Sequence, residues 1–429
     1  MRYSDRPICR PGEDALGRAD FSLALARAID QLLLAREGFV ISVLGAWGAG
    51  KSSVIEMTLR FLTHLEMQRA SEHTLFGDAG PLPQGLEQLE QLAVVFDRIR
   101  DQVNAYDGLN VNFPAAQRNY RLDLFQGWLR NDTDAQKADR YWRLQQKIDE
   151  KRRTIQVRFS PWLIAGRSEL ASALFSELAR ALGEKLGANV KDAFVSILKR
   201  LAEFAPLAGA GLDLTTGFGV GKLLSAGATW SSNVATSMVT GPTLDELREN
   251  LKILLRSLNE QRILVVIDDL DRLTPPEAVV MVSLIKSLGD LPNVIYLLSY
   301  DENNLARLIR KGAKVDGREF LRKIVQYPID LPRLQDEDLT RLLDSDLTTI
   351  IGDLRPEDQR RLGITWHFVF RHYLRTPRDV RLYINSVAVA LSAAKDYVDI
   401  VDLLLLEVIR LYEPQLYRWI KENLSELAQ

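Results

Sequence analysis

Short runs of branched and aromatic apolar residues recur along the chain, and stretches with helical periodicity separate them. Continuous apolar runs of this length are typical of strands that are buried in a parallel sheet. The runs predict strands at residues 39–44, 154–160, 263–267, 293–299 and 325–331. Because helical stretches lie between them, the sequence predicts an α/β fold with a five-stranded, mostly parallel sheet.

The glycine-rich stretch after the first predicted strand carries the most specific chemistry. Residues 45–52 read Gly-Ala-Trp-Gly-Ala-Gly-Lys-Ser and fill the phosphate-loop pattern G-x-x-x-x-G-K-[ST] without a mismatch. Gly45 and Gly50 are expected to adopt backbone angles closed to other residues, so that the loop N–H groups surround a β-phosphate. Lys51 then faces the β- and γ-phosphate oxygens, and the Ser52 hydroxyl binds Mg²⁺. The predicted nucleotide-binding residues of this stretch are Gly45, Ala46, Trp47, Gly48, Ala49, Gly50, Lys51, Ser52 and Ser53.

Two adjacent acids follow the apolar run at 263–267. The carboxyl end of a central parallel strand is where such sheets bind ligands. Asp268 is predicted to hold Mg²⁺, and Asp269 to orient or deprotonate the attacking water. Ser299 ends the next predicted strand, where it either senses the γ-phosphate or only terminates the strand. Asp301 and Asn303 are expected to cap the helix that follows.

Beyond Pro332 no strand is predicted, and residues 335–429 indicate a C-terminal helical lid domain. Thr376 followed by Pro377 is a strong helix start. It places Arg378 and Arg381 one turn apart on the same side of that helix. A guanidinium delivered onto the γ-phosphate would couple the nucleotide to the lid, with Arg378 the favoured candidate. In the alternative, both arginines pair with surface acids.

Lys51 and Asp268 are separated by far more chain than one strand and two helices need, which indicates insertions. One insertion, residues 67–153, is polar and helical in pattern and ends in a charge-rich arm. The other, residues 204–241, is rich in Gly, Ala and Ser, and the chain is uncharged from 223 to 244. That length could cross a bilayer, but many Ser, Thr and Asn favour a flexible excursion over a membrane hairpin. The remaining predicted domains are an N-terminal helical segment at 1–38 and a core made of 39–66 with 154–334.

Composition and net charge limit the class of protein and the compartment in which it is expected. The 429 residues are 46% hydrophobic and 26% charged, which are ordinary values for a globular protein. The net charge of −2 argues against a large nonspecific nucleic-acid footprint, but the basic arm at 135–153 keeps direct nucleic-acid handling open as an alternative. Cys9 is the only cysteine, so no intramolecular disulfide can form. The N-terminus lacks an apolar core of signal-peptide length. We therefore expect a cytoplasmic protein, with membrane association through 204–241 as the alternative.

The order and spacing of the motifs described above resemble those of KAP-family P-loop NTPases, a branch of the STAND-like ATPases. Besides the glycine-rich loop, six stretches of the chain resemble motifs of that family. They are Leu16-Gly17-Arg18, Phe159-Ser160-Pro161-Trp162, Asp268-Asp269-Leu270-Asp271-Arg272, Phe320-Leu321-Arg322-Lys323-Ile324-Val325-Gln326, Thr376-Pro377-Arg378 and Leu405-Leu406-Glu407-Val408-Ile409-Arg410-Leu411.

The resemblance implies ATP-dependent NTPase activity with Mg²⁺, often in bacterial phage or plasmid exclusion and in membrane-associated signalling. It also implies that Gly17 and Arg18 lie near the adenine. In a homo-oligomer, a basic residue such as Arg318, Arg322 or Lys323 would face the nucleotide across the interface. Two function classes stay open: an ATPase that drives a conformational cycle, and a slow nucleotide-gated scaffold. Because the sequence has no recognisable nuclease, protease or deaminase site, any toxic output is expected from a protein partner.

Overall fold

The structure is a computed structural model that describes residues 6–32, 37–70, 153–164, 167–183, 244–256, 258, 261–352, 354–394 and 398–427. The predicted insertion at 204–241 and most of the one at 67–153 lie outside these residues. So does most of the uncharged stretch that ends at Leu244.

A five-stranded parallel sheet forms the centre of the α/β part, as the sequence predicts. Its strands follow the order β2-β3-β4-β1-β5, and every neighbouring pair is parallel. Their bounds are β1 (Phe39–Leu44), β2 (Thr154–Phe159), β3 (Arg262–Ile267), β4 (Val294–Tyr300) and β5 (Tyr327–Asp330). Leu44 pairs with Tyr300 and Ile267 with Leu298, so β1, β4 and β3 end at one edge of the sheet.

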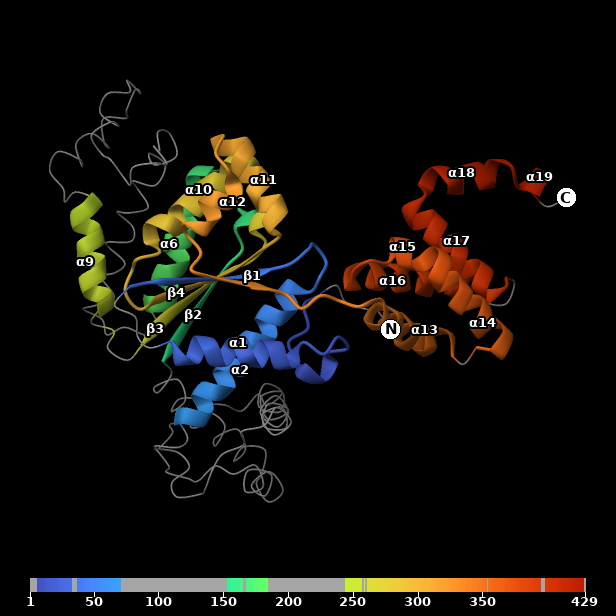
Figure 1. The fold of residues 1–429 in the computed structure, drawn as a ribbon, viewed down its shortest axis with the longest axis horizontal. Helices are drawn as coiled ribbons and strands as arrows, with labels where there is room; N and C mark the ends of the chain where they lie inside the picture. The colour runs from blue at the N-terminus through green and yellow to red at the C-terminus, as the bar shows by residue number, and fades with distance from the viewer. Residues whose placement is uncertain are drawn as a thin grey trace, which may run out of the picture. The chain divides into compact units, whose positions relative to one another are not determined.

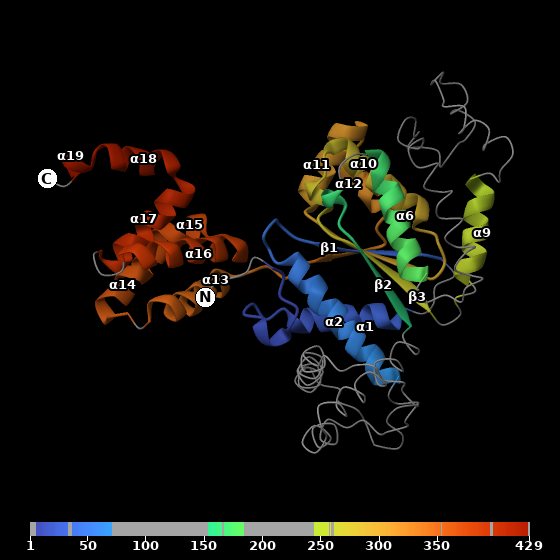
Figure 2. The same cartoon turned by 180° about the vertical axis from the view of Figure 1, so that it is seen from behind.

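Helices cover both faces of the sheet (Figure 1). On one face lie α6 (Arg167–Gly183), α10 (Pro275–Leu288), α11 (Glu302–Ala313) and α12 (Gly317–Arg322). Their apolar side chains share one buried cluster with Val157, Val265 and Tyr296 of the strands. On the other face run α1 (Ala19–Gln31) and α2 (Lys51–Ala70), while α9 (Leu244–Arg256) lies to the side (Figure 2). The buried Arg262 side chain fixes α1 to β3, because its Nη2 lies 3.2 Å from Asp30 Oδ1.

The C-terminal region is helical throughout its described residues. It contains α13 (Asp336–Ile351), α14 (Pro356–Thr365), a π-helical turn (Trp366–Phe370), α15 (Arg371–Tyr373), α16 (Pro377–Ala394), α17 (Ile400–Tyr412), α18 (Pro414–Glu422) and α19 (Leu424–Leu427). Phe370 and Tyr383 are fully buried at the centre of its core. The Tyr383 hydroxyl donates to the Leu404 carbonyl at 2.9 Å, which joins α16 to α17.

The predicted helix starts can be checked directly. Asp301 is the N-cap of α11, and its Oδ1 accepts from the Asn304 backbone N–H at 2.9 Å. The prediction for Asp301 is therefore confirmed. Asn303 does not cap this helix; it lies inside the first turn, and its Oδ1 accepts from Arg318. α16 begins at Pro377 as predicted.

The chain divides into two compact units. The sheet unit contains residues 23–45 and 58–330, and the helical unit contains residues 1–22, 46–57 and 331–429. The glycine-rich loop after β1 therefore clusters with the C-terminal helices. The boundaries of these two units differ from the domain boundaries predicted from the sequence. The predicted domains stay predictions.

Candidate functional site

The glycine-rich loop connects β1 to α2, and two of its glycines determine its path. Gly48 has φ +77° and Gly50 has φ +92°, in the left-handed region that other residues rarely adopt. Ala49 N–H donates to the Ala46 carbonyl at 3.2 Å and closes the turn. Helix α2 begins immediately afterwards, at Lys51. A helix that starts on such a loop directs unpaired backbone N–H groups at the space in front of it, which suits an anion.

Gly45 differs from the prediction, because it is absent from the positive-φ residues. Its N–H donates to the Tyr300 carbonyl at 3.3 Å and so extends the pairing of β1 with β4. At this position the glycine continues the strand, and the left-handed angles come three residues later.

Lys51 and Ser53 lie at the start of α2 with defined contacts. The Lys51 side chain is buried, and its Nζ donates to the Ala46 carbonyl at 3.1 Å. A buried ammonium beside the loop fits a phosphate group, because it carries three donors and a full charge. Ser53 Oγ accepts from the Ile8 backbone N–H at 3.2 Å, so the N-terminal segment uses this hydroxyl. Ser52 is half-buried between them.

At the carboxyl edge of the sheet, Asp268 receives two hydrogen bonds on one oxygen. The fully buried Ser299 hydroxyl donates to Asp268 Oδ1, and the Asp269 N–H donates to the same atom at 2.9 Å. Among the described residues, no hydrogen bond to Oδ2 is found. The two donors fix the carboxylate and leave an oxygen for a hard cation such as Mg²⁺, which takes oxygen ligands and retains water. Ser299 is therefore placed to orient Asp268.

Asp269 has a strained backbone and a charged neighbour. Its φ is +59°, and its Oδ1 lies 3.0 Å from Arg272 Nε. The Arg272 guanidinium in turn lies over the Trp162 ring, 5.3 Å from the ring centroid. Left-handed backbone at a non-glycine residue costs about 1–3 kcal/mol and is common at functional sites. The carboxylate is only 15% exposed and is held by a cation.

In the helical unit, the start of α16 lies against the loop. Thr376 N–H and Thr376 Oγ1 both donate to Asp379 Oδ2 at 2.9 Å, which fixes the corner before Pro377. Arg378 lies over the Trp47 ring, with its guanidinium carbon 5.2 Å from the centroid. A Cβ on Gly48 would come within 2.8 Å of Thr376 Oγ1. The structure thus brings Arg378 to the phosphate loop.

Arg381 follows the alternative reading, since it lies 3.7 Å from Asp346 of α13. Burial raises the pKa of Asp346, and the Arg381 charge opposes that shift. Of the basic residues considered for a neighbouring subunit, Arg318 donates to Asn303 and Lys323 pairs with Glu319 at 2.8 Å. Arg322 is exposed on the same helix.

Arg18 is buried, with 4% of its surface exposed, and desolvation lowers its pKa. Its Nη1 donates to the Ala49 carbonyl of the loop, and its Nη2 to the Pro332 carbonyl at 3.2 Å. Gly17 before it has φ +65°. Arg18 was predicted only through the family resemblance. The Asp269–Arg272 pair was not predicted, although its spacing of three residues was an available signal. No sequence signal pointed to the contact of Arg272 with Trp162.

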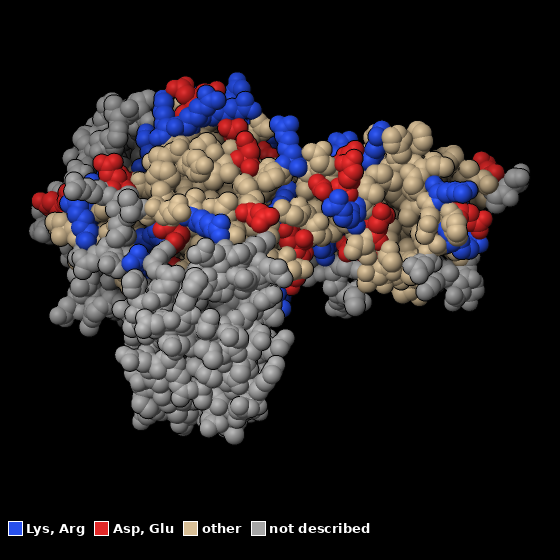
Figure 3. Space-filling model, turned by 60° about the horizontal axis from the view of Figure 1, so that its bottom comes forward, with Lys and Arg blue, Asp and Glu red and all other residues tan. Residues whose placement is uncertain are grey.

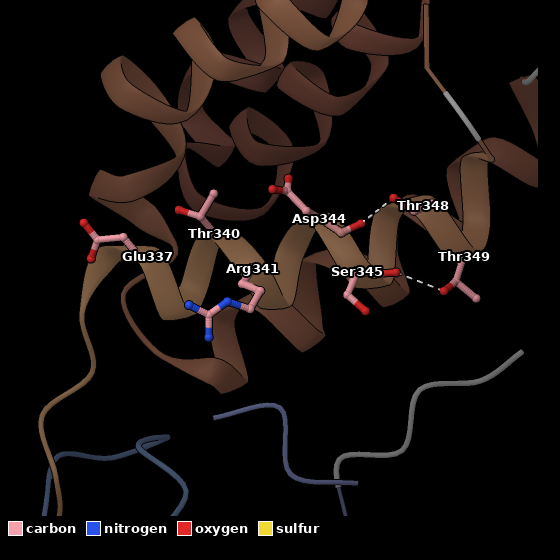
Figure 4. Close-up of a pocket in the computed structure, with 7 residues that line it drawn as sticks. All are labelled: Glu337, Thr340, Arg341, Asp344, Ser345, Thr348 and Thr349. Atoms are coloured by element: carbon pink, nitrogen blue, oxygen red, sulfur yellow. Dashed lines mark hydrogen bonds between the residues drawn. The ribbon is translucent and has the colours of Figure 1, made fainter. Parts of the chain in front are cut away.

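Two hollows lie elsewhere, on the C-terminal helices. One, of about 680 Å³, is lined along α13 by polar side chains, including Thr340, Asp344 and Thr348 (Figure 4). Its threonines donate back to their own helix, as Thr348 Oγ1 does to the Asp344 carbonyl at 2.7 Å. The other, of about 410 Å³, reaches from α13 to Trp366 and Phe370. Neither includes a predicted site residue.

The described residues lack two further features. They contain no group of three or more His, Cys, Asp or Glu that could hold a metal ion. None of their helices combines the length and apolar character needed to cross a membrane.

Comparisons with known proteins give a family match and two similar proteins. The KAP family P-loop domain matches residues 18–394. The phage T7 exclusion protein of Escherichia coli (strain K12) is 30% identical over 189 residues, which are 43% of this chain and 25% of that protein. A solved structure of the Walker-type ATPase of Pyrococcus abyssi is 10% identical, with a TM-score of 0.37 over 99% of this chain and 80% of that chain.

Proposed function

Because the chain belongs to the KAP family of P-loop domains, we propose that it binds ATP with Mg²⁺ and hydrolyses it as a nucleotide-driven switch. The observation that carries this proposal is the loop geometry. The left-handed Gly48 and Gly50 are followed at once by the buried Lys51 at the start of a helix. This arrangement presents N–H groups and one ammonium to a polyphosphate.

Each site residue has a proposed role. The loop amides and Lys51 hold the β- and γ-phosphates, and Ser52 and Asp268 supply oxygen ligands to the metal ion. When bound, Mg²⁺ neutralises charge that develops on the phosphates. Ser299 orients Asp268 through its hydroxyl. Asp269 orients the attacking water, and Arg378 meets the charge on the γ-phosphate.

The first test replaces Lys51. Lys51→Ala should lower ATP–Mg²⁺ affinity by about 100-fold, because a buried charge-assisted contact to phosphate is lost. Lys311→Ala is the matched control, since it removes an exposed ammonium from α11. Isothermal titration of both variants against the unmodified protein measures the change. Equal affinity in Lys51→Ala would show that the loop is not the ATP site.

The Asp269–Arg272 pair favours a second reading, the slow scaffold. The Arg272 Nε lies 3.0 Å from Asp269 Oδ1, so this oxygen is already engaged and is less available to orient an attacking water. In this reading, ATP binding recruits a protein partner and turnover is incidental. Asp269→Asn separates the readings: under the ATPase reading it should keep ATP binding and lose turnover. If the unmodified protein holds ATP with negligible basal kcat, even with candidate partners added, the scaffold reading stands instead.

The setting that we propose is bacterial defence against phage. Its support is the match to a phage T7 exclusion protein, which is confined to a quarter of that protein. The effector activity would belong to a protein partner. Direct nucleic-acid binding is less favoured, since the net charge is −2 and the face in Figure 3 intermixes basic and acidic side chains.

A further inference from the structure

Arg18 is a charged side chain in a place where charge is costly. Its guanidinium is almost wholly buried, and its two hydrogen-bond acceptors are neutral backbone carbonyls, those of Ala49 and Pro332. The carboxylates of Asp14 and of Asp338, in the first turn of α13, stabilise its charge in part. Its Nε finds no acceptor within the described residues. These acceptors and carboxylates return only part of the desolvation cost of the guanidinium, because desolvation still lowers the pKa of Arg18. The burial of Arg18 is therefore weak evidence of a purely stabilising role.

Hydrogen bonds from neighbouring residues fix the backbone on both sides of Arg18. Asp14 Oδ1 accepts from the Leu16 N–H at 3.1 Å, and Oδ2 accepts from the Ala19 N–H at 2.7 Å. Gly17 supplies the left-handed angle between them. Ser22 then donates to the Arg18 carbonyl from its N–H at 2.9 Å and from its hydroxyl at 3.0 Å. The backbone at Arg18 is held on both sides, so the guanidinium is delivered to a fixed point.

The loop is shaped around that point. A Cβ on Gly50 would lie 2.8 Å from Arg18 Nη1, closer than real side chains approach. The glycine that the phosphate-loop pattern requires thus also makes room for Arg18. The two carbonyls that Arg18 binds belong to different segments. Ala49 lies in the loop, and Pro332 lies between β5 and the start of α13 at Asp336.

We propose that Arg18 is a positioning residue that ties the phosphate loop to the segment 331–335, so that a change in the loop on ATP binding reaches the first turn of α13. This proposal rests on the ATP site proposed above. In this proposal Arg18 binds the Ala49 carbonyl of the loop, whereas the family resemblance implies a contact with the adenine. The rigid fork of the guanidinium suits this role, because it can donate to two carbonyls at once.

Hydrogen exchange of the full chain tests the tie. Peptides that cover residues 333–343 are compared with and without saturating ATP–Mg²⁺, so that a loss of affinity does not enter the result. In the unmodified protein and in the exposed control Arg27→Lys, we expect ATP to slow exchange there at least about threefold. Arg18→Met should abolish this response, and Arg18→Lys should keep part of it, because an ammonium still donates to one carbonyl. An unchanged response in Arg18→Met overturns the proposal.

A second measurement keeps the test decisive without ATP. If Arg18→Met fails to fold, Arg18→Lys alone carries the comparison. Without nucleotide, Arg18→Lys should speed exchange in at least one of the loop peptide 46–52 and the peptide 333–343, because one of the two carbonyl contacts is lost. Unchanged exchange in both peptides contradicts the tie. If the unmodified protein binds no ATP, the proposed function fails, and this nucleotide-free comparison still decides whether Arg18 joins the two segments.

Discussion

At the scale of single residues, Gly48 shows how closely the loop and the start of α16 approach each other. It occupies a variable position of the phosphate-loop pattern, so the motif alone does not demand a glycine there. The structure demands it twice, through φ +77° and through the nearness of Thr376 Oγ1 and Arg378 Cβ. The second reason is steric, and it connects nucleotide binding to the helical unit.

Gly48→Ala separates these two reasons when it is compared with Gly352→Ala. Gly352 has a similar φ of +81° but nothing within 4 Å of its Cβ position. Both variants should lose about 1–3 kcal/mol of unfolding free energy from the left-handed backbone. Only Gly48→Ala should also weaken ATP binding, by about tenfold or more, since its Cβ displaces the corner at Thr376. Urea unfolding and ATP titration of both variants measure this. Equal ATP affinity in the two would remove the steric argument.

Ser299 gives a second prediction at this scale. Ser299→Ala should raise the Mg²⁺ concentration needed for half-maximal ATP binding, because Asp268 Oδ1 loses one of its two donors. The control is Ser283→Ala, which removes a buried hydroxyl that has no hydrogen-bond partner among the described residues and should be neutral or slightly stabilising. A Mg²⁺ titration of ATP binding decides. No shift in Ser299→Ala would leave Asp268 oriented by the Asp269 N–H alone.

The structural role of a residue could be predicted from the sequence where short-range chemistry alone determines it. The Asp301 cap and the helix start at Pro377 follow from short-range chemistry, and both are confirmed. The role of Arg381 could not be decided in this way. Its pairing with Asp346 depends on how α13 packs on α16, and helical periodicity gives an apolar face but no register between helices.

At the scale of elements, the central strands β1, β3 and β4 were predictable because a parallel strand that is buried on both faces reads as a continuous apolar run, whereas the edge strand β5 is mostly exposed. β3 is buried at all six positions, and β4 at all seven. The order of the strands could not be predicted in this way, because contacts between residues far apart in the sequence determine which strands pair. That order puts β2 beside β3, and it thereby brings Trp162 to Arg272, the residue that pairs with Asp269.

The cap of α11 yields a prediction at the element scale. Asp301→Ala should lower the unfolding free energy by about 0.5–2 kcal/mol, because the Asn304 N–H loses its acceptor. Asp301→Asn should stay close to the unmodified protein, since an amide oxygen caps nearly as well. Urea denaturation with unchanged m-values is the measurement. A loss of equal size in Asp301→Asn would point to the charge of Asp301 instead of its hydrogen bond.

At the scale of the whole molecule, the phosphate loop clusters with the C-terminal helices. Its contacts within the helical unit are made by Arg18, Thr376 and Arg378. A loop that is held on two sides by one helical unit is suited to report the nucleotide to that unit. This grouping supports the proposal that the protein is a nucleotide-driven switch.

The defence proposal can be tested in cells. Bacteria that express this chain with its neighbouring genes should yield fewer plaques on phage challenge, and Lys51→Ala should restore plaque numbers. Lys311→Ala should keep the protection. Protection that survives in Lys51→Ala would mean that the nucleotide site is not needed for it, and unchanged plaque counts in all strains would contradict the defence role.

Trp47 lies in the phosphate loop with 61% of its surface exposed and Arg378 over its ring. The protein thus carries its own fluorophore at the proposed nucleotide site. Indole emission is sensitive to a nearby cation and to solvent, so ATP arrival should be visible in a stopped-flow trace without any label. A methylanthraniloyl nucleotide should accept resonance energy from the same ring. The Trp47→Phe variant gives the emission of the other tryptophans, which is then subtracted.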